Sequence, residues 1–257
     1  LEALESTINT VSIFLVILGF YIFGAMSALV ISAIVGWYLT QRYLSKFNKK
    51  NPMRPKIIKS MMVFSIPVIV QTVSTTSLYT ADLILVKHFF SAHDAGLYAA
   101  LSTLGKIIFF GSGPISSVMF PIISQKQAIG ENYKQVFKYS IIATLLLSSC
   151  ILIVYWLFPT LAINLLYGSA YLGAANLLLW FGIFMTFFTL ASLLINFNLS
   201  LGRTAVVVPA SIAALLQIIL IWFYHSSLYS VILISTIVAA LLMISLFIYS
   251  TYGKRFS

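Results

Sequence analysis

The stretch YTADLILVKHFF, residues 79–90, is apolar enough to lie in lipid, yet it carries Asp82 and Lys87. The whole chain has this character, because 61% of its 257 residues are hydrophobic and only 8% are charged. Soluble domains carry about 25% charged residues. We therefore predict an all-α integral membrane protein, since helices satisfy their own backbone hydrogen bonds in lipid.

Long apolar runs divide the chain into about eight predicted transmembrane helices. A helix needs about 20 apolar residues to cross the hydrocarbon core. The run 7–44 is long enough for two spans, and a basic segment follows it at 45–58. Six further spans are predicted at about 59–90, 96–123, 136–158, 173–200, 204–224 and 228–250. We expect Pro67 to bend the first of these six.

The net charge of +10 does not indicate a nucleic-acid partner. Seven of the fifteen Lys and Arg residues lie between Arg42 and Lys59. If this segment is cytoplasmic and the spans alternate, thirteen of the fifteen fall on the cytoplasmic side, as the positive-inside rule expects. We predict that both termini are cytoplasmic and that the basic segment also attracts anionic lipid.

Asp82, Lys87 and Lys106 are the ionisable residues within the predicted spans, where such groups are functional candidates. The turn SAHDAG is centred near Asp94, twelve residues from both Asp82 and Lys106, so the two should lie at similar depth. Two interpretations stay open. Either they form an ion pair that fixes packing, or Lys106 and Lys87 face a cavity and attract an anionic substrate. Lys87 is close enough to the turn to reach the outer surface.

The segment GSGPISSVMFP, residues 111–121, combines two glycines with two prolines. We expect hinge residues here, at Gly111, Gly113 and Pro114, and also at Pro67. The alternative is a simple proline kink, which membrane helices tolerate.

No metal site or cofactor is predicted. His88, His93 and Asp94 are metal-binding residue types, but three groups near one loop without a further ligand are weak support for zinc.

Three segments appear in an order that is typical of one family: FSIPVIVQTVSTTSLYTADLILVKHF, SAHDAGLYAALSTLGKIIFF and SSVMFPIIS. They resemble the second half of the polysaccharide-export flippases, within the multidrug/oligosaccharidyl-lipid/polysaccharide exporter superfamily. In that group a Pro-bearing helix ends in an Asp, here Pro67 and Asp82. The next helix carries a basic residue and ends in Phe-Pro, here Lys106 and Phe120–Pro121.

The resemblance implies a protein of two lobes with six helices each. Residues 1–44 would be the last two helices of the N-terminal lobe, 45–58 a cytoplasmic linker and 59–257 the six-helix C-terminal lobe. The remainder of the N-terminal lobe would then be an intramolecular partner that this chain lacks. The family also implies the cell (plasma) membrane as the location.

The activity implied is a membrane transporter, not an enzyme. It would flip an anionic, polyprenyl-phosphate-linked oligosaccharide to the outer leaflet by alternating access. Lys106 and Lys87 would bind the phosphate, and Asp82 would hold Lys106 in place or exchange protons.

Two other functions remain as alternatives. A cation-coupled multidrug exporter of the same superfamily would use Asp82 as its ion site. A membrane glycan polymerase or ligase would need acids and bases near the outer face, where the chain offers only His88, His93, Asp94 and His225.

Overall fold

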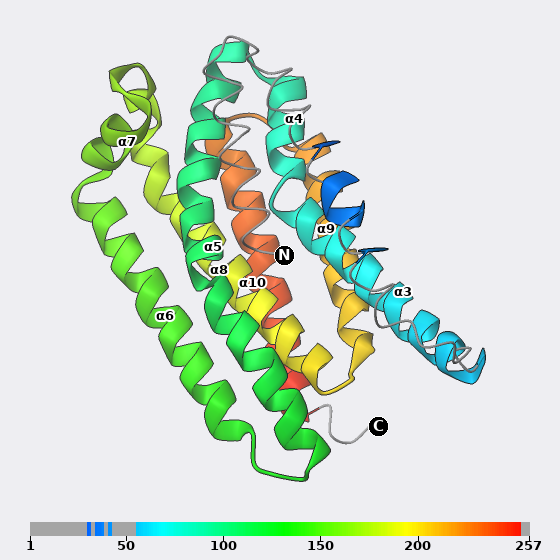
Figure 1. The fold of residues 1–257 in the computed structure, drawn as a ribbon. Helices are drawn as coiled ribbons and strands as arrows, with labels where there is room; N and C mark the ends of the chain where they lie inside the picture. The colour runs from blue at the N-terminus through cyan, green and yellow to red at the C-terminus, as the bar shows by residue number, and fades with distance from the viewer. Residues whose placement is uncertain (1–29, 32–33, 39–40, 43–54, 253–257) are drawn as a thin grey trace. The chain divides into compact units, whose positions relative to one another are not determined.

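The computed structural model describes residues 30–31, 34–38, 41–42 and 55–252, with side chains from Ser65 to Thr251 in the last range. Its regular elements there are all helical (Figure 1). The α-helices are α3 (Pro55–Leu78), α4 (Ala81–Phe89), α5 (Ala92–Ala128), α6 (Lys134–Leu157), α7 (Pro159–Tyr167), α8 (Ala175–Ser200), α9 (Val207–Phe223) and α10 (Leu228–Tyr252), with 3-10 turns η2 (Ser169–Ala174) and η3 (Thr204–Val206).

Five helical segments in the described part are long and apolar enough to cross a membrane: Ala92–Ala128, Lys134–Leu157, Ser169–Ser200, Thr204–Phe223 and Leu228–Thr251. The bent pair α3–α4 supplies a sixth. These match the six spans predicted after residue 58, and the all-α membrane class is confirmed. The two earlier spans and the linker 45–58 lie largely or wholly outside the described residues.

The chain divides into two compact units, Leu1–Lys59 and Ser60–Ser257. The second unit contains all the contacts described below. Its identity as one lobe of a two-lobe protein stays a prediction.

The span 59–90 bends by 42° where Tyr79 and Thr80 separate α3 from α4. Helix α3 continues through Pro67, and a bend or hinge at Pro67 stays a prediction. After the break, α4 begins at Ala81, and the buried side chain of its second residue, Asp82, is held by α5.

Helix α8 is the centre of the second unit. It packs against α5, α6 and α10 (Figure 1), and 17 of its 26 residues are buried. Its close contact with α5 depends on Gly105, where a Cβ would overlap the Phe181 ring of α8. Gly182 allows the same approach on its other side, because a Cβ there would lie 2.7 Å from Leu152 of α6.

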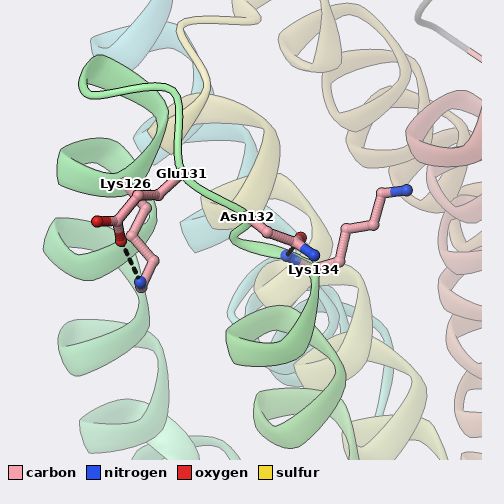
Figure 2. Close-up of polar contacts among 4 residues, drawn as sticks. All are labelled: Lys126, Glu131, Asn132 and Lys134. Atoms are coloured by element: carbon pink, nitrogen blue, oxygen red, sulfur yellow. Dashed lines mark hydrogen bonds and ion pairs between the residues drawn. The ribbon is translucent and has the colours of Figure 1, made fainter.

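One end of this unit carries Lys126, Lys134, Lys138 and Arg203, and we call it the basic end. It comprises the α5–α6 turn with the start of α6, the α8–α9 turn and the C-terminal end of α10. Figure 2 shows the α5–α6 turn, where the Lys126 ammonium and the Glu131 carboxylate form an ion pair at 2.7 Å. The opposite end carries the α4–α5 and α9–α10 turns.

Candidate functional site

Asp82 is the second residue of α4 and is fully buried. One oxygen of its carboxyl group accepts a hydrogen bond from the Tyr98 hydroxyl of α5 at 2.7 Å. The other accepts from the Leu83 backbone N–H at 2.8 Å. A helix N-terminus also favours an acidic side chain. The carboxyl group therefore stabilises the start of α4 and joins it to α5.

Asp82 and Lys106 do not form an ion pair, so that interpretation of the two charges is corrected. The hairpin is centred on Phe90, not near Asp94, because α5 already begins at Ala92. The Ser91 hydroxyl accepts from the Asp94 N–H at 3.1 Å and donates to its carboxylate at 2.8 Å, so Ser91 is the N-cap of α5. Asp82 lies eight residues before Phe90 and Tyr98 eight residues after it, so these two share a depth.

Lys106 is half-buried and makes no ion pair with a carboxylate of a described residue. Its Nζ lies 5.4 Å from the centre of the Tyr79 ring, at the bend between α3 and α4. That distance allows a cation–π interaction. The Tyr79 ring itself packs against Phe109 and Phe188, at 5.4 and 5.6 Å between centroids. An aromatic cluster therefore holds the cation.

Lys87 is exposed in the last turn of α4. It lies three residues before Phe90, whereas Lys106 lies sixteen residues after it. A difference of thirteen residues corresponds to about 20 Å of helix rise. The two lysines predicted to bind the phosphate, Lys87 and Lys106, therefore lie at different depths.

A polar cavity of about 240 Å³ lies between α3, α5, α6 and α8. Hydroxyl and amide side chains form most of its lining. Each helix contributes, with Gln71 and Thr75 from α3, Ser112 from α5, Thr144 from α6, and Ser192 and Asn196 from α8. No charged side chain lines it.

Three hydroxyl oxygens of this lining are buried and have no hydrogen-bond partner among the described residues: those of Ser112, Thr144 and Ser192. A buried polar group without a partner costs about 1–3 kcal/mol. Such groups are usually satisfied by water or a ligand. The cavity is therefore suited to water or to a ligand rich in hydroxyl groups.

Lys106 and the polar cavity lie along one face of α5. Lys106, Phe109, Gly113 and Ser117 are spaced i, i+3, i+7 and i+11, and the last three line the cavity. Lys106 does not line the cavity itself; it lies about one helical turn along α5 from Phe109, the nearest lining residue of this helix. This arrangement can hold an anionic group beside an uncharged polar one.

Sequence reasoning missed the cavity because it followed the charges. A signal was present in the pairs Gln71/Thr75, Ser112/Ser116 and Ser192/Asn196, each with polar residues four apart within an apolar span. Such pairs share a helix face. Nothing in the spacing shows which of these faces meet.

The predicted hinge residues Gly111, Gly113 and Pro114 lie within an unbroken α5. Gly113 lines the cavity, and a Cβ there would meet nothing within 4 Å. Whether α5 flexes at this point stays a prediction.

Two histidines of the opposite end, His88 and His225, pack on aromatic rings. His88 stacks on Trp222 at 5.9 Å between centroids, and His225 stacks on Phe89 at 3.8 Å. Asp94 is engaged with Ser91. In the part of the chain that the structure describes, no three metal-binding side chains form a group.

Comparison with known proteins places the chain in a family. The family described as "Polysaccharide biosynthesis protein" matches residues 3–176. An uncharacterised membrane protein of Methanocaldococcus jannaschii, MJ1068, is 26% identical over 183 residues. That alignment covers 66% of this chain and spans only 35% of the relative's length. No solved structure matches. Since the family match covers more than half of the chain, this multi-pass membrane protein belongs to the polysaccharide biosynthesis protein family.

Proposed function

We propose that this chain forms part of a transporter that flips a polyprenyl-phosphate-linked oligosaccharide to the outer leaflet. The observation that carries the proposal is Lys106, a half-buried cation that makes no ion pair with a described carboxylate and lies on the α5 face that continues into a hydroxyl-lined cavity. Family membership favours a role in polysaccharide biosynthesis. A phosphate joined to a sugar has the matching chemistry, because one part is anionic and the next is rich in hydroxyl groups.

The physical task is to carry a large polar head across hydrocarbon while its prenyl chain stays in lipid. Alternating access achieves this if a polar cavity opens first to one side and then to the other. Lys106 would bind the phosphate, and hydroxyl groups of the cavity would bind sugar. Lys87, about 20 Å away along the helix axes, would meet the phosphate only at the end of the path.

Asp82 acts through Tyr98 in this proposal, not through Lys106. It keeps α4 attached to α5 and so fixes the bend that places Tyr79 under the Lys106 ammonium. The chain performs no chemistry on the sugar. It lies in the cell membrane with the basic end and both termini in the cytoplasm, and residues of an N-terminal lobe complete the central cavity.

Complementation tests this function. The full-length protein is expressed in a host that lacks its own polysaccharide flippase, as wild type, Lys106→Ala, Lys106→Arg and Lys126→Ala. We expect Lys106→Ala to lose export at normal protein level and Lys106→Arg to keep part of it. Lys126→Ala is the matched control, because it removes a lysine from the same helix that is already paired with Glu131.

Normal export with Lys106→Ala would contradict the role of this residue. Drug resistance on overexpression, without any rescue of export, would favour a cation-coupled drug exporter. If deletion of this protein from its own cell leaves unlinked lipid-bound sugar units on the outer leaflet, a polymerase or ligase would be favoured.

A further inference from the structure

An apolar groove of about 330 Å³ lies between α6 and α10, with α8 as its floor. Its walls include Ile141 and Leu145 of α6 and Ile244 and Phe247 of α10, and Leu190 and Leu194 of α8 lie beneath. Every side chain that lines it is apolar. It is separate from the polar cavity, with which it shares no lining residue.

The groove lies in the halves of α6, α8 and α10 that are nearer the basic end. Helix α6 starts at Lys134, so Ile141 lies about 10 Å and Leu145 about 16 Å along it. The lining residues therefore span about 6 Å along α6, and about 8 Å along α10 from Met243 to Ile248. Half of a hydrocarbon core is about 15 Å thick, so the groove has room for part of one lipid chain within one leaflet.

Two lysines stand directly above the groove on its α6 wall. Lys134, Lys138, Ile141 and Leu145 are spaced i, i+4, i+7 and i+11, so they share one face of α6. Both lysines are exposed. Figure 2 shows the Lys134 side chain extending away from the Lys126–Glu131 pair.

The described carboxylates are engaged elsewhere. Glu131 pairs with Lys126, Asp94 bonds Ser91 and Asp82 bonds Tyr98. Lys134 and Lys138 make no ion pair with any of them. Their charge is therefore available to an anion at the level where a lipid headgroup meets the protein.

The headgroup decides which lipid such a groove prefers. A chain that moves from the bilayer into the groove gains no hydrophobic free energy, because lipid tails are as apolar as the groove. Basic residues at a membrane surface, in contrast, attract anionic lipids. A groove that ends below two lysines without a carboxylate partner is therefore expected to favour lipids with an anionic headgroup.

We propose that this groove binds one anionic phospholipid of the bilayer, with its phosphate between Lys134 and Lys138 and one chain between α6 and α10. The lipid connects two helices that both pack on α8 and so stabilises this side of the unit. The proposal does not depend on the transported substrate.

Native mass spectrometry of the purified full-length protein tests it. The protein is incubated in detergent with phosphatidylglycerol or with phosphatidylcholine of the same chain length. We expect wild type to retain phosphatidylglycerol preferentially. Lys134→Gln and Lys138→Gln should each reduce its retention about fivefold. The double variant Lys126→Gln/Glu131→Gln should leave it unchanged, because it removes the neighbouring ion pair without changing the net charge or freeing a carboxylate.

A second variant tests the groove itself. Ile244→Trp should displace phosphatidylglycerol while both lysines remain, because the indole fills the space of the chain. Equal retention of the two phospholipids by wild type would overturn the proposal, as would an equal loss in the double variant Lys126→Gln/Glu131→Gln. Undecaprenyl phosphate is added as a competitor. If it is retained and neither phospholipid is, the groove holds the substrate's tail and the proposal is wrong.

Discussion

Helices α8 and α3 have similar lengths, 26 and 24 residues, and both are apolar, yet their surroundings differ. Helix α8 is enclosed by α5, α6 and α10. Among the described side chains of α3, only Ser74 and Leu78 are buried. Apolar composition thus places both helices in the membrane, but it does not distinguish a helix that faces protein from one that faces lipid or a second lobe.

The two helices are also held differently. Helix α8 approaches α5 and α6 closely through Gly105 and Gly182. Helix α3 is attached near its C-terminal end, by Leu78 in the core and by a 2.9 Å hydrogen bond between the hydroxyls of Ser74 and Ser211. We therefore expect α3 to be the more mobile wall of the polar cavity and α8 the fixed one.

Gly105→Ala should break this arrangement most severely. A methyl group there would overlap the Phe181 ring and lie 2.9 Å from the Met185 Cγ. Overpacking of this kind costs about 1–3 kcal/mol. Thermal unfolding in detergent should show a lower midpoint for Gly105→Ala. Gly113→Ala is the control on the same helix, where a Cβ meets nothing within 4 Å. Equal midpoints for the two variants would disprove the close contact between α5 and α8 at Gly105.

Tyr98→Phe should have the next largest effect, because it removes a donor from the fully buried Asp82 carboxyl group. Loss of a partner from a buried polar group costs about 1–3 kcal/mol. Tyr155→Phe is the control, since its hydroxyl donates to the Leu104 carbonyl at 2.7 Å, an uncharged group. Unfolding in detergent should show the larger loss for Tyr98→Phe. A loss no larger than in the control would mean that the α4–α5 connection does not depend on this bond.

Ser74→Ala should have the smallest effect on stability and a selective effect on dynamics. Hydrogen bonds between membrane helices contribute about 0.6 kcal/mol on average. Hydrogen exchange followed by mass spectrometry should become faster in α3 and stay unchanged in α8. Thr72→Ala is the control, because its hydroxyl bonds the Val68 carbonyl of the same helix. Faster exchange in both variants, or in neither, would refute Ser74–Ser211 as the attachment of α3.

The spans were predictable because each depends on a local property, the length of an apolar run. The connection between α4 and α5 was harder, since SAHDAG reads as a loop. Its first residue, Ser91, is the N-cap of α5, so the helix begins at Ala92 and the hairpin centre moves to Phe90. That displacement changed the partner of Asp82 from Lys106 to Tyr98.

The bend between α3 and α4 also depends on a contact between helices that local sequence signals do not predict. Proline is the strongest local signal for a kink, but neighbouring helices tolerate it in membranes. The observed bend at Tyr79–Thr80 has no such signal, because it depends on the contact of Asp82 with another helix.

The sequence by itself determined the membrane class, the positions of the six described spans, the concentration of charge at one end and the choice of Lys106 as a candidate. These follow from composition and order along the chain. Only the tertiary structure decided the partner of Asp82, the aromatic support of Lys106 and the meeting of hydroxyl groups from four helices in one cavity. The reason is physical: hydropathy acts on each helix separately, whereas contacts between helices depend on their depth, rotation and crossing.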